Sequence, residues 1–453
     1  FKRIINQSFR NRIKIDMKKS VLISVLLLLT GYGFAQELKK ITLQEAFTLA
    51  EQNSKLLQLD SLKIQALDIK KTQSQNAMLP VLGLNSSYTR LSNNIDPFQI
   101  PFSGEVFTLN PQILNQFGNR VSIQQPIFQG LKNWNTMKSL DQLKTASALD
   151  KQKDQQDIKL NVIQQYYNLY KLQQTLIVLD SNIAQTQVRV NDVSKFKEAG
   201  LALNNDVMRA ELQKTNLLVT KADIESMVKI YNFNMCVLLG LDFNTKIEVE
   251  NPETVENAST TIQSFITTSY ADRTEFKAQD YRLKAADYQI KASKSAYMPT
   301  VSAVGNGYYN NPNQRVFPQE NNFKATWDVG VSVSWNIMQL YTARAVVGDA
   351  KNQKAQQELV TAQLKDNISS EVNAAYETLK VALLKIDLAQ RAIEQATENK
   401  RILDNRFGAQ VALLSDVLEA DQFLLQAQTN LLNAQADAAI ANYKLQRSLG
   451  SIK

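Results

Sequence analysis

Two long runs of the chain, residues 158–193 and 368–403, share one spacing of apolar positions. In each run these positions recur at alternating intervals of four and three residues, and the second run repeats the first at an offset of 210. Such spacing keeps one stripe of a helix facing a partner, so both runs are predicted to be coiled-coil-type helices. Polar residues interrupt the two seams only at Gln165, Thr186 and Lys400. The first seam reads Ile158, Val162, Gln165, Leu169, Leu172, Leu176, Leu179, Ile183, Thr186, Val190 and Val193, and the second reads Ile368, Val372, Ala375, Leu379, Ala382, Ile386, Ala389, Ile393, Ala396, Lys400 and Leu403.

The repetition extends beyond these two helices and predicts a chain built from two similar halves. Residues 127–240 match 337–450 without a gap, and this match aligns Asp206 with Asp416. Earlier in each half, Pro80 corresponds to Pro299 at an offset of 219. One loop between Pro80 and residue 127 is therefore expected to be nine residues longer in the first half.

Within the first half, turn and capping signals divide the chain into three helices and two strands. Thr42 and Glu45 have the spacing of a capping box and start a helix that Pro80 ends. Gly200 breaks a helix that would be ~100 Å long at 1.5 Å per residue, and Asn205 or Asp206 is expected to cap the returning helix. The predicted elements are a helix over 42–78, strands near 82–88 and 121–127 with a loop over 92–117 between them, and helices over 131–199 and 206–239.

The second half is predicted to repeat this order. It begins with a helix over 262–297, followed by a strand from Pro299, a loop over 311–322, a strand over 324–338, and helices over 341–407 and 413–449.

The segment 327–337 has the pattern of a strand in a membrane barrel. Valine and tryptophan alternate with polar residues and glycine, and Trp327 and Trp335 bracket the apolar face. Eight steps of ~3.4 Å at a tilt of about 40° cover ~20 Å, close to the apolar band of an outer-membrane barrel. A strand of a soluble sandwich also alternates, but the signal peptide and the long helices favour a lipid-facing girdle at Trp327 and Trp335. Four strands cannot close a barrel, so the barrel is expected to be shared between chains.

The start of the chain has the features of a secretory signal peptide. Lys18 and Lys19 precede an apolar stretch, and Gly33 and Ala35 fit a cleavage site after residue 35. An anchor helix is the alternative, although the stretch is too short to span a bilayer. The predicted division is an upstream segment and signal peptide over 1–35, a first repeat over 36–240, an equatorial connector over 241–260, and a second repeat over 261–450.

Composition removes several classes of function. The chain contains no histidine and a single cysteine, Cys236, which excludes histidine acid–base chemistry, thiolate zinc clusters and internal disulfides. No polar catalytic cluster is evident, so we expect neither an enzyme nor a cofactor or metal site. The net charge of +8 includes +6 from residues 1–35, which leaves +2 and gives no reason to expect nucleic-acid binding.

With these features the chain resembles the TolC family of outer-membrane efflux proteins. The resemblance rests on the duplicated unit, the breaks at Pro80 and Pro299, the exit Gln125-Pro126-Ile127-Phe128, and the two turns that precede Asp206 and Asp416. It implies a mainly α fold with a small β portion, in which three chains form a twelve-stranded barrel in outer-membrane lipid and a twelve-helix periplasmic tunnel.

The implied function is a passive exit duct of a tripartite efflux or type I secretion system, gated at its periplasmic tip. The implied partners are two further copies of the chain, a periplasmic adaptor and an inner-membrane pump. A secreted or periplasmic structural coiled-coil protein without a pore is the alternative; it explains the heptads but neither the tryptophan-bracketed strand nor the duplication.

The resemblance also points to residues at the tip. Asp206, Asp416 and Glu419 are expected to line the pore constriction, although Asp416 and Glu419 also fit a capping role at a helix start. Gln410 replaces the glycine usual at the second turn, and Ala412 stands where the best-known member has a basic residue, so closure is expected to rest on other contacts. The candidate adaptor contacts, which could instead only shape tight turns, are Ala199, Gly200, Leu201, Ala202, Ala409, Val411 and Ala412.

Overall fold

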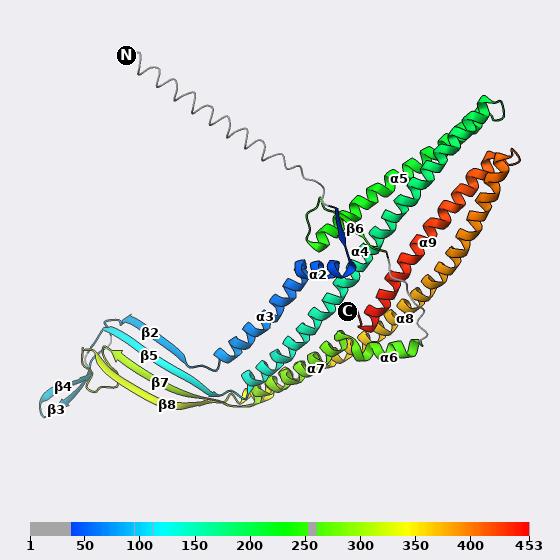
Figure 1. The fold of residues 1–453 in the computed structure, drawn as a ribbon. Coiled ribbons are helices and arrows are strands. Elements are labelled where there is room, and N and C mark those ends of the chain that lie inside the picture. The colour runs from blue at the N-terminus through cyan, green and yellow to red at the C-terminus, as the bar shows by residue number, and fades with distance from the viewer. Residues whose placement is uncertain (1–37, 95, 111, 252–260, 453) are drawn as a thin grey trace, which may run out of the picture.

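The computed structural model describes residues 38–94, 96–110, 112–251 and 261–452. The predicted signal peptide and residues 252–260 of the predicted connector lie outside the described residues. The molecule is elongated, with a sheet at one end and two helical hairpin tips at the other (Figure 1).

The first half contains the strands and helices expected, with additions. Its elements are β1 (Leu38–Ile41), α2 (Leu43–Asn53), α3 (Lys55–Asn76), β2 (Val81–Arg90), β3 (Phe98–Phe102), β4 (Glu105–Asn110), β5 (Asn115–Phe128), α4 (Lys132–Glu198), α5 (Asn204–Leu239) and β6 (Lys246–Val249). The second half contains α6 (Ile262–Asp272), α7 (Thr274–Ser293), the short 3-10 helix η1 (Lys294–Tyr297), β7 (Thr300–Asn310), β8 (Lys324–Ser334), α8 (Met338–Gly408) and α9 (Leu414–Leu449).

Two single helices of the prediction are each broken once. Ser54 has an extended backbone, and its hydroxyl accepts from the Leu57 amide (3.3 Å) to cap α3. Arg273 has an extended backbone at the equivalent position of the second half and separates α6 from α7. The predicted start is confirmed, because Thr42 Oγ1 accepts from the Glu45 amide at 3.2 Å.

Two other details of the prediction were wrong, and the connector contains a strand that was not foreseen. The loop over 92–117 contains an antiparallel hairpin, β3–β4, and the connector contains β6, which pairs with β1 in parallel. The N-cap of α5 is Leu203, not Asn205 or Asp206. Asp206 instead lies at the third helical position, and its carboxylate accepts from the Leu203 amide at 2.9 Å.

The helices form one layer in which α4 and α8 run nearly the full length (Figure 1). Toward the sheet, α7 packs between α4 and α8; toward the tip, α9 packs between the same two helices, while α5 packs on α4. The predicted seams face these partners, and no seam residue is exposed. The buried members are Ile158, Val162, Leu169, Leu179, Thr186, Val190, Val193, Ile368, Val372, Leu379, Ala382 and Ala389.

The main core lies at mid-length, where α2 and the β1–β6 pair cover α4. Ile41, Phe47 and Ile163 are buried there together with Tyr166. The Tyr166 hydroxyl donates to the Ile41 carbonyl (2.9 Å) and accepts from the Glu250 amide (2.8 Å). It therefore ties the start of the first half to the connector.

A buried ion network lies at the start of α7. Arg273 pairs with Glu275 (2.8 Å) and Glu371 (2.7 Å), while Arg447 pairs with Glu275 (2.9 Å) and Asp157 (2.7 Å). The network thus joins α4, α7, α8 and α9. Burial alone would raise the pKa of Glu275, but the two guanidinium groups lower it to about 2.

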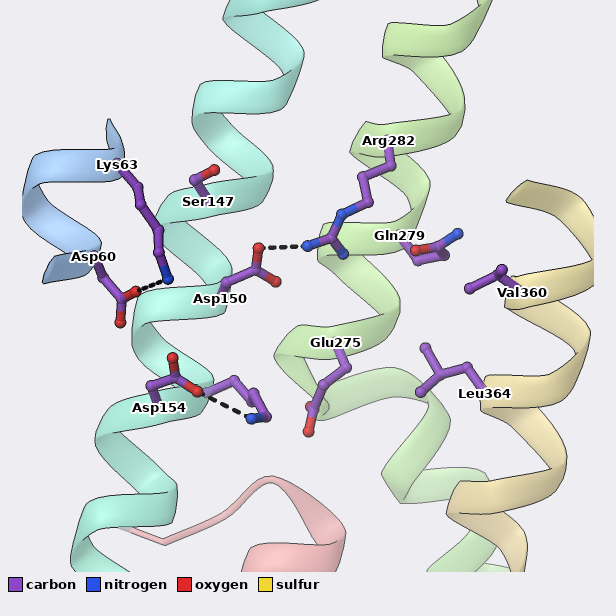
Figure 2. Close-up of a pocket in the computed structure, with 11 residues that line it drawn as sticks. Asp60, Lys63, Ser147, Asp150, Asp154, Glu275, Gln279, Arg282, Val360 and Leu364 are labelled. Carbon is purple, nitrogen blue, oxygen red and sulfur yellow. Dashed lines mark hydrogen bonds and ion pairs between the residues drawn. The ribbon is translucent and has the colours of Figure 1, made fainter. Parts of the chain in front are cut away.

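Beside this network, a polar cavity of about 460 Å³ lies between α3, α4, α7 and α8 (Figure 2). Asp150 on α4 pairs with Arg282 on α7, and Asp60 on α3 pairs with Lys63 at 2.8 Å. The first pair joins two adjacent helices, and the second lies within one helix. The cavity is therefore a gap in the packing between neighbouring helices of the layer.

Across the described ranges, no helix is long and apolar enough to cross a membrane. No group of histidine, cysteine and carboxylate side chains that could hold a metal ion is present among the same residues.

Candidate functional site: the four-stranded sheet and the helical tip

The sheet at one end of the molecule is antiparallel throughout, in the order β2-β5-β7-β8. Its register aligns Trp327 with Gly307, Val121 and Leu84 across the four strands. The next row on the same face contains Val329, Gly305, Ile123 and Leu82. Trp327 is 75% exposed, and Val121, Leu84 and Val329 are exposed as well. This face of the sheet is therefore apolar and uncovered.

Aromatic side chains mark both ends of the apolar face. At the end far from the helices, the rings of Tyr88, Phe117, Phe323 and Tyr309 follow one another with centroids 5.0, 5.8 and 5.0 Å apart. At the end near the helices, Trp335 follows β8 and is exposed. Aromatic rings at both borders of an apolar band are typical of strands that face lipid.

The opposite face of the sheet is polar and hydrogen-bonded. Arg120 on β5 donates to the Asn306 side chain on β7 (2.7 Å), and Asn306 donates to Asp328 on β8 (2.6 Å). Tyr308 lies on the same face, below the guanidinium of Arg315 at 4.4 Å from the ring centroid. The two faces are thus chemically distinct across all four strands.

Neither edge of this sheet has a partner in the described part of the chain: β2 pairs only with β5, and β8 pairs only with β7. An edge strand in lipid would leave its backbone donors and acceptors without hydrogen bonds, which costs several kcal/mol per group. The sheet is complete only if its edges meet other strands.

At the other end of the molecule, the two halves make the same turn. Gly200 has a φ of +74°, and the Leu201 amide donates to the Phe196 carbonyl at 2.7 Å. Gln410 has a φ of +60°, and the Val411 amide donates to the Arg406 carbonyl at 2.8 Å. The departure from glycine at Gln410 therefore leaves the turn unchanged, at the cost of a left-handed backbone on a residue with a Cβ atom.

Each turn exposes large apolar side chains. Leu201 and Leu203 are exposed in the first hairpin, and Val411 and Leu413 are exposed at the equivalent positions of the second. The sequence interpretation missed Leu203 and Leu413, which precede the helix starts. Of the smaller tip residues, Ala199, Gly200 and Ala409 are exposed, while Ala202 and Ala412 are half-buried and line a cavity of about 300 Å³ between the hairpins.

The three predicted constriction carboxylates have different surroundings. Asp206 is half-buried, caps the start of α5 and lines the cavity between the hairpins. Asp416 occupies the equivalent position of α9 and accepts from the Ser415 hydroxyl at 3.2 Å. Glu419 is exposed on α9, one turn further on. Asp416 and Glu419 do not line the cavity, so within one chain they are not gathered with Asp206 into one site.

An ion chain that the sequence interpretation missed joins the two hairpins near the tip. Arg189 on α4 pairs with Asp404 on α8, Asp404 pairs with Lys400 (3.4 Å), and Lys400 pairs with Asp421 on α9. The rings of Phe196 and Phe407 lie 5.8 Å apart beside it. Lys400, the polar interruption of the second seam, therefore adds an ion pair between α8 and α9, which also pack through apolar residues.

The two flanks of the helical layer carry apolar side chains with no partner in the described part of the chain. On α5 these exposed residues include Met208, Leu212, Val219, Met227, Ile230 and Val237, and on α8 they include Val381, Leu384, Leu388 and Ile402. Val381, Leu384 and Leu388 keep the four-and-three spacing of a helix seam, and Ile402 lies two heptads beyond Leu388. Both flanks have the composition of helix-packing surfaces.

A one-sided apolar sheet joined to a long layer of paired helices defines a membrane channel with a helical extension. The chain belongs to the Outer membrane efflux protein family, whose pattern matches residues 47–225 and 266–451. The protein is an outer-membrane efflux channel of the TolC type with a periplasmic helical extension, and it is not a structural coiled coil without a pore. Channels of this family are non-enzymatic conduits that work as trimers in efflux systems.

Individual relatives are distant in sequence and close in fold. The chain is 20% identical over 337 residues to the outer membrane efflux protein BepC of Brucella suis, covering 73% of this chain and 71% of that protein. It superimposes on the Campylobacter jejuni CmeC channel with a TM-score of 0.74 at 17% identity, covering 90% and 85% of the two chains. The Vibrio cholerae protein VceC gives a TM-score of 0.72 at 17% identity, covering 90% and 96%.

Proposed function

We propose that three copies of this chain form one closed channel, in which twelve strands make the barrel and the layers of helices make the tunnel. The observation that carries this proposal is the four-stranded sheet with one exposed apolar face and two open edges. Joining β2 of one copy to β8 of the next keeps every neighbouring pair antiparallel and removes the edges. Trp327 and Trp335 then belong to the lipid-facing aromatic girdles, and the polar face lines the lumen.

The helical flanks support the same assembly. In a closed ring, the exposed apolar stripe on α5 of one copy meets α8 of its neighbour. Burying apolar surface stabilises by roughly 25 cal/mol per Å², so a stripe that runs along a helix supplies a substantial part of the assembly energy. The trimer thereby covers the surfaces that a single chain leaves exposed.

The two hairpin tips are proposed to bind a periplasmic adaptor of an inner-membrane pump, which makes the channel the exit duct of a tripartite export system. Exposed apolar residues on a periplasmic surface favour a protein partner, and Leu201, Leu203, Val411 and Leu413 give the tips such a surface. Ala199, Gly200 and Ala409 allow close approach, while Ala202 and Ala412 line the cavity between the hairpins.

A cross-linking experiment tests this contact. Cysteine at 202 and at 412 should cross-link to a co-expressed adaptor, and the native thiol will not interfere because Cys236 is fully buried. Cysteine at Thr108, on the hairpin at the opposite end of the molecule, is the matched control. Cross-links that form equally at Thr108, or only there, would refute adaptor binding at the tips.

The tip is also proposed to hold the pore constriction. In a trimer, Asp206, Asp416 and Glu419 would each become a ring of three carboxylates, and a narrow acidic ring favours cations and repels anions. Glu419 supports this role because its side chain is exposed on α9, whereas Asp206 is also engaged in helix capping.

Planar-bilayer recordings test the constriction. Asp416→Ala combined with Glu419→Ala should raise single-channel conductance, weaken cation selectivity and weaken block by multivalent cations. Glu398→Ala, which also removes an exposed carboxylate from a helix, is the control. A folded trimeric double variant that conducts and blocks like the parent would leave Asp416 with only its role at the helix start.

A further inference from the structure

The first part of the connection between β7 and β8 turns back over the polar face of the sheet, where Asn313 and Arg315 are bonded. Asn313 is buried, at 3% exposure, and its amide donates to the Lys324 carbonyl (2.9 Å) and the Thr326 hydroxyl (3.2 Å). Thr326 alternates with Trp327 along β8 and therefore belongs to the polar face. The first residues of the loop are thus fixed on that face.

Arg315 holds the next part of the loop on the same face. Its guanidinium donates to Asp328 at 2.6 Å and lies 4.4 Å from the ring centroid of Tyr308. Its backbone amide donates to the Asn313 side chain at 3.0 Å, which links the two anchoring residues. A charge-assisted hydrogen bond and a cation–π contact on one side chain together fix the position of the loop. These two contacts of Arg315, with Asp328 and with Tyr308, are called the clamp below.

We propose that residues 311–322 fold into the outer mouth of the channel, where the Arg315–Asp328 pair holds them, and that they form a second constriction, distinct from the one at the helical tip. This inference rests on the proposed trimer, in which the polar face of each sheet lines the lumen. Twelve strands enclose a wider lumen than the eight that side chains alone can fill, and three inward-folded loops would narrow it.

The charge of this constriction differs from that of the tip. Arg120 and Arg315 both lie beside Tyr308, while Asp328 is the carboxylate bonded to Arg315. Each copy therefore brings two guanidinium groups and one carboxylate beside Tyr308, while the Glu320 carboxylate of the loop is balanced by Lys324 at 3.2 Å. Three copies give a net positive ring. Rings of arginine in a pore favour anions, so cargo would pass an acidic ring at the tip and a basic ring at the mouth.

Thiol-directed block tests the position of the loop. Gln314→Cys places an exposed thiol next to the clamp, and Arg90→Cys places one at the end of β2 on the apolar face. A maleimide bearing a polyethylene glycol chain, added from the loop side of a planar bilayer, should label both variants. We expect the current to fall by roughly half or more for Gln314→Cys and to stay unchanged for Arg90→Cys.

A second pair of variants tests the clamp. Adding Arg315→Ala to Gln314→Cys should weaken the block, because the loop is released, whereas adding Arg90→Ala should not. Block by hexacyanoferrate from the loop side should likewise weaken in Arg315→Ala alone and persist in Arg90→Ala. All variants should remain trimeric on gels without heating.

The outcomes separate this inference from the proposed function. A labelled Gln314→Cys channel whose current is unaffected would overturn the inward fold of the loop. A block that Arg315→Ala leaves unchanged would overturn the clamp, and a parent channel insensitive to hexacyanoferrate would overturn the basic ring. A parent that forms no pore at all would instead contradict the proposed function.

Discussion

The two halves of the chain share one order of elements, but they stabilise one equivalent region by different chemistry. This region, here called the joint, is the break in the first helix of each half together with the glycine turn that packs against it. The helix break at Ser54 corresponds to the break at Arg273, and Gly240 approaches Asn53 as Gly450 approaches Asp272 and Arg273. In the first half, the joint is held by neutral hydrogen bonds: Ser54 caps α3, and Asn53 donates to the Leu239 carbonyl at 2.9 Å. In the second half, Arg273 belongs to a buried ion network. The duplicated backbone is therefore stabilised by different interactions in the two halves.

The helical hairpins differ in the same way. In the second half, α9 packs against both α8 and α4, and Lys400 adds ion pairs within the hairpin. In the first half, α5 packs mainly on α4 and leaves an apolar flank exposed. Helix α9 therefore lies inside the layer, whereas α5 and α8 form its two flanks.

The largest expected difference in stability between the two halves is found when the two joints are each weakened by a substitution. Arg273→Ala leaves Glu275 with one fewer partner and removes the partner of Glu371, and breaking such a buried pair costs roughly 3–5 kcal/mol. Asn53→Ala in the first half loses two neutral hydrogen bonds, to the Leu49 and Leu239 carbonyls, for about 1–2 kcal/mol. Thermal unfolding of the purified trimer compares the two. Equal losses would contradict the assignment of different energetics to the two joints.

Acid should weaken the second joint selectively. The pKa of Glu275 is lowered from 4.5 to about 2, so its stabilising effect is fully present above pH ~5 and is lost as the pH falls toward 2. A shift of this size corresponds to about 3 kcal/mol at neutral pH. Glu275→Gln should be less stable than the parent at pH 7, and the gap should close near pH 2. A gap that is constant over this range would show that the carboxylate charge contributes nothing.

The sequence predicted the features that depend on local periodicity and on duplication. The seams, the long helices, the turn at Gly200 and the four sheet strands follow from residue spacing. The helix breaks were missed because Ser54 and Arg273 are compatible with a helix, and only their contacts with Leu57 and with the ion network fix the extended backbone. The loop clamp was missed because Arg315 and Asp328 are brought together by strand pairing.

The candidate site was predicted only in part for the same reason. The turn residues and carboxylates of the tip could be named from their positions before helix starts. Their surroundings could not be predicted, because Asp206 lines the cavity between the hairpins through the packing of α4 against α9, which no local sequence pattern records. Lys400 was identified as a break in the seam, but its partner Asp421 lies on another helix.

The smallest expected effects on stability are those of substitutions at the two hairpin turns. Gly200→Ala places a Cβ atom on a backbone with φ +74° and should destabilise the tip by about 1 kcal/mol, although the added atom meets nothing within 4 Å. Gln410→Gly should relieve the same strain and stabilise by up to about 1 kcal/mol. Hydrogen exchange at the Leu201 and Val411 amides measures both effects. Changes of the same sign would contradict the equivalence of the turns.

The central claim is that the open edges of the sheet meet in a closed ring of three chains. Single cysteines along the polar face of β2, at Asn85 or Ser87, combined with cysteines on the polar face of β8, at Thr326 or Ser332, would form disulfides across the joined edges. Copper-catalysed oxidation of protein in detergent should give a covalent species that stops at the mass of a trimer. A product that remains monomeric for every pair, or a ladder that continues beyond three chains, would contradict the closed ring.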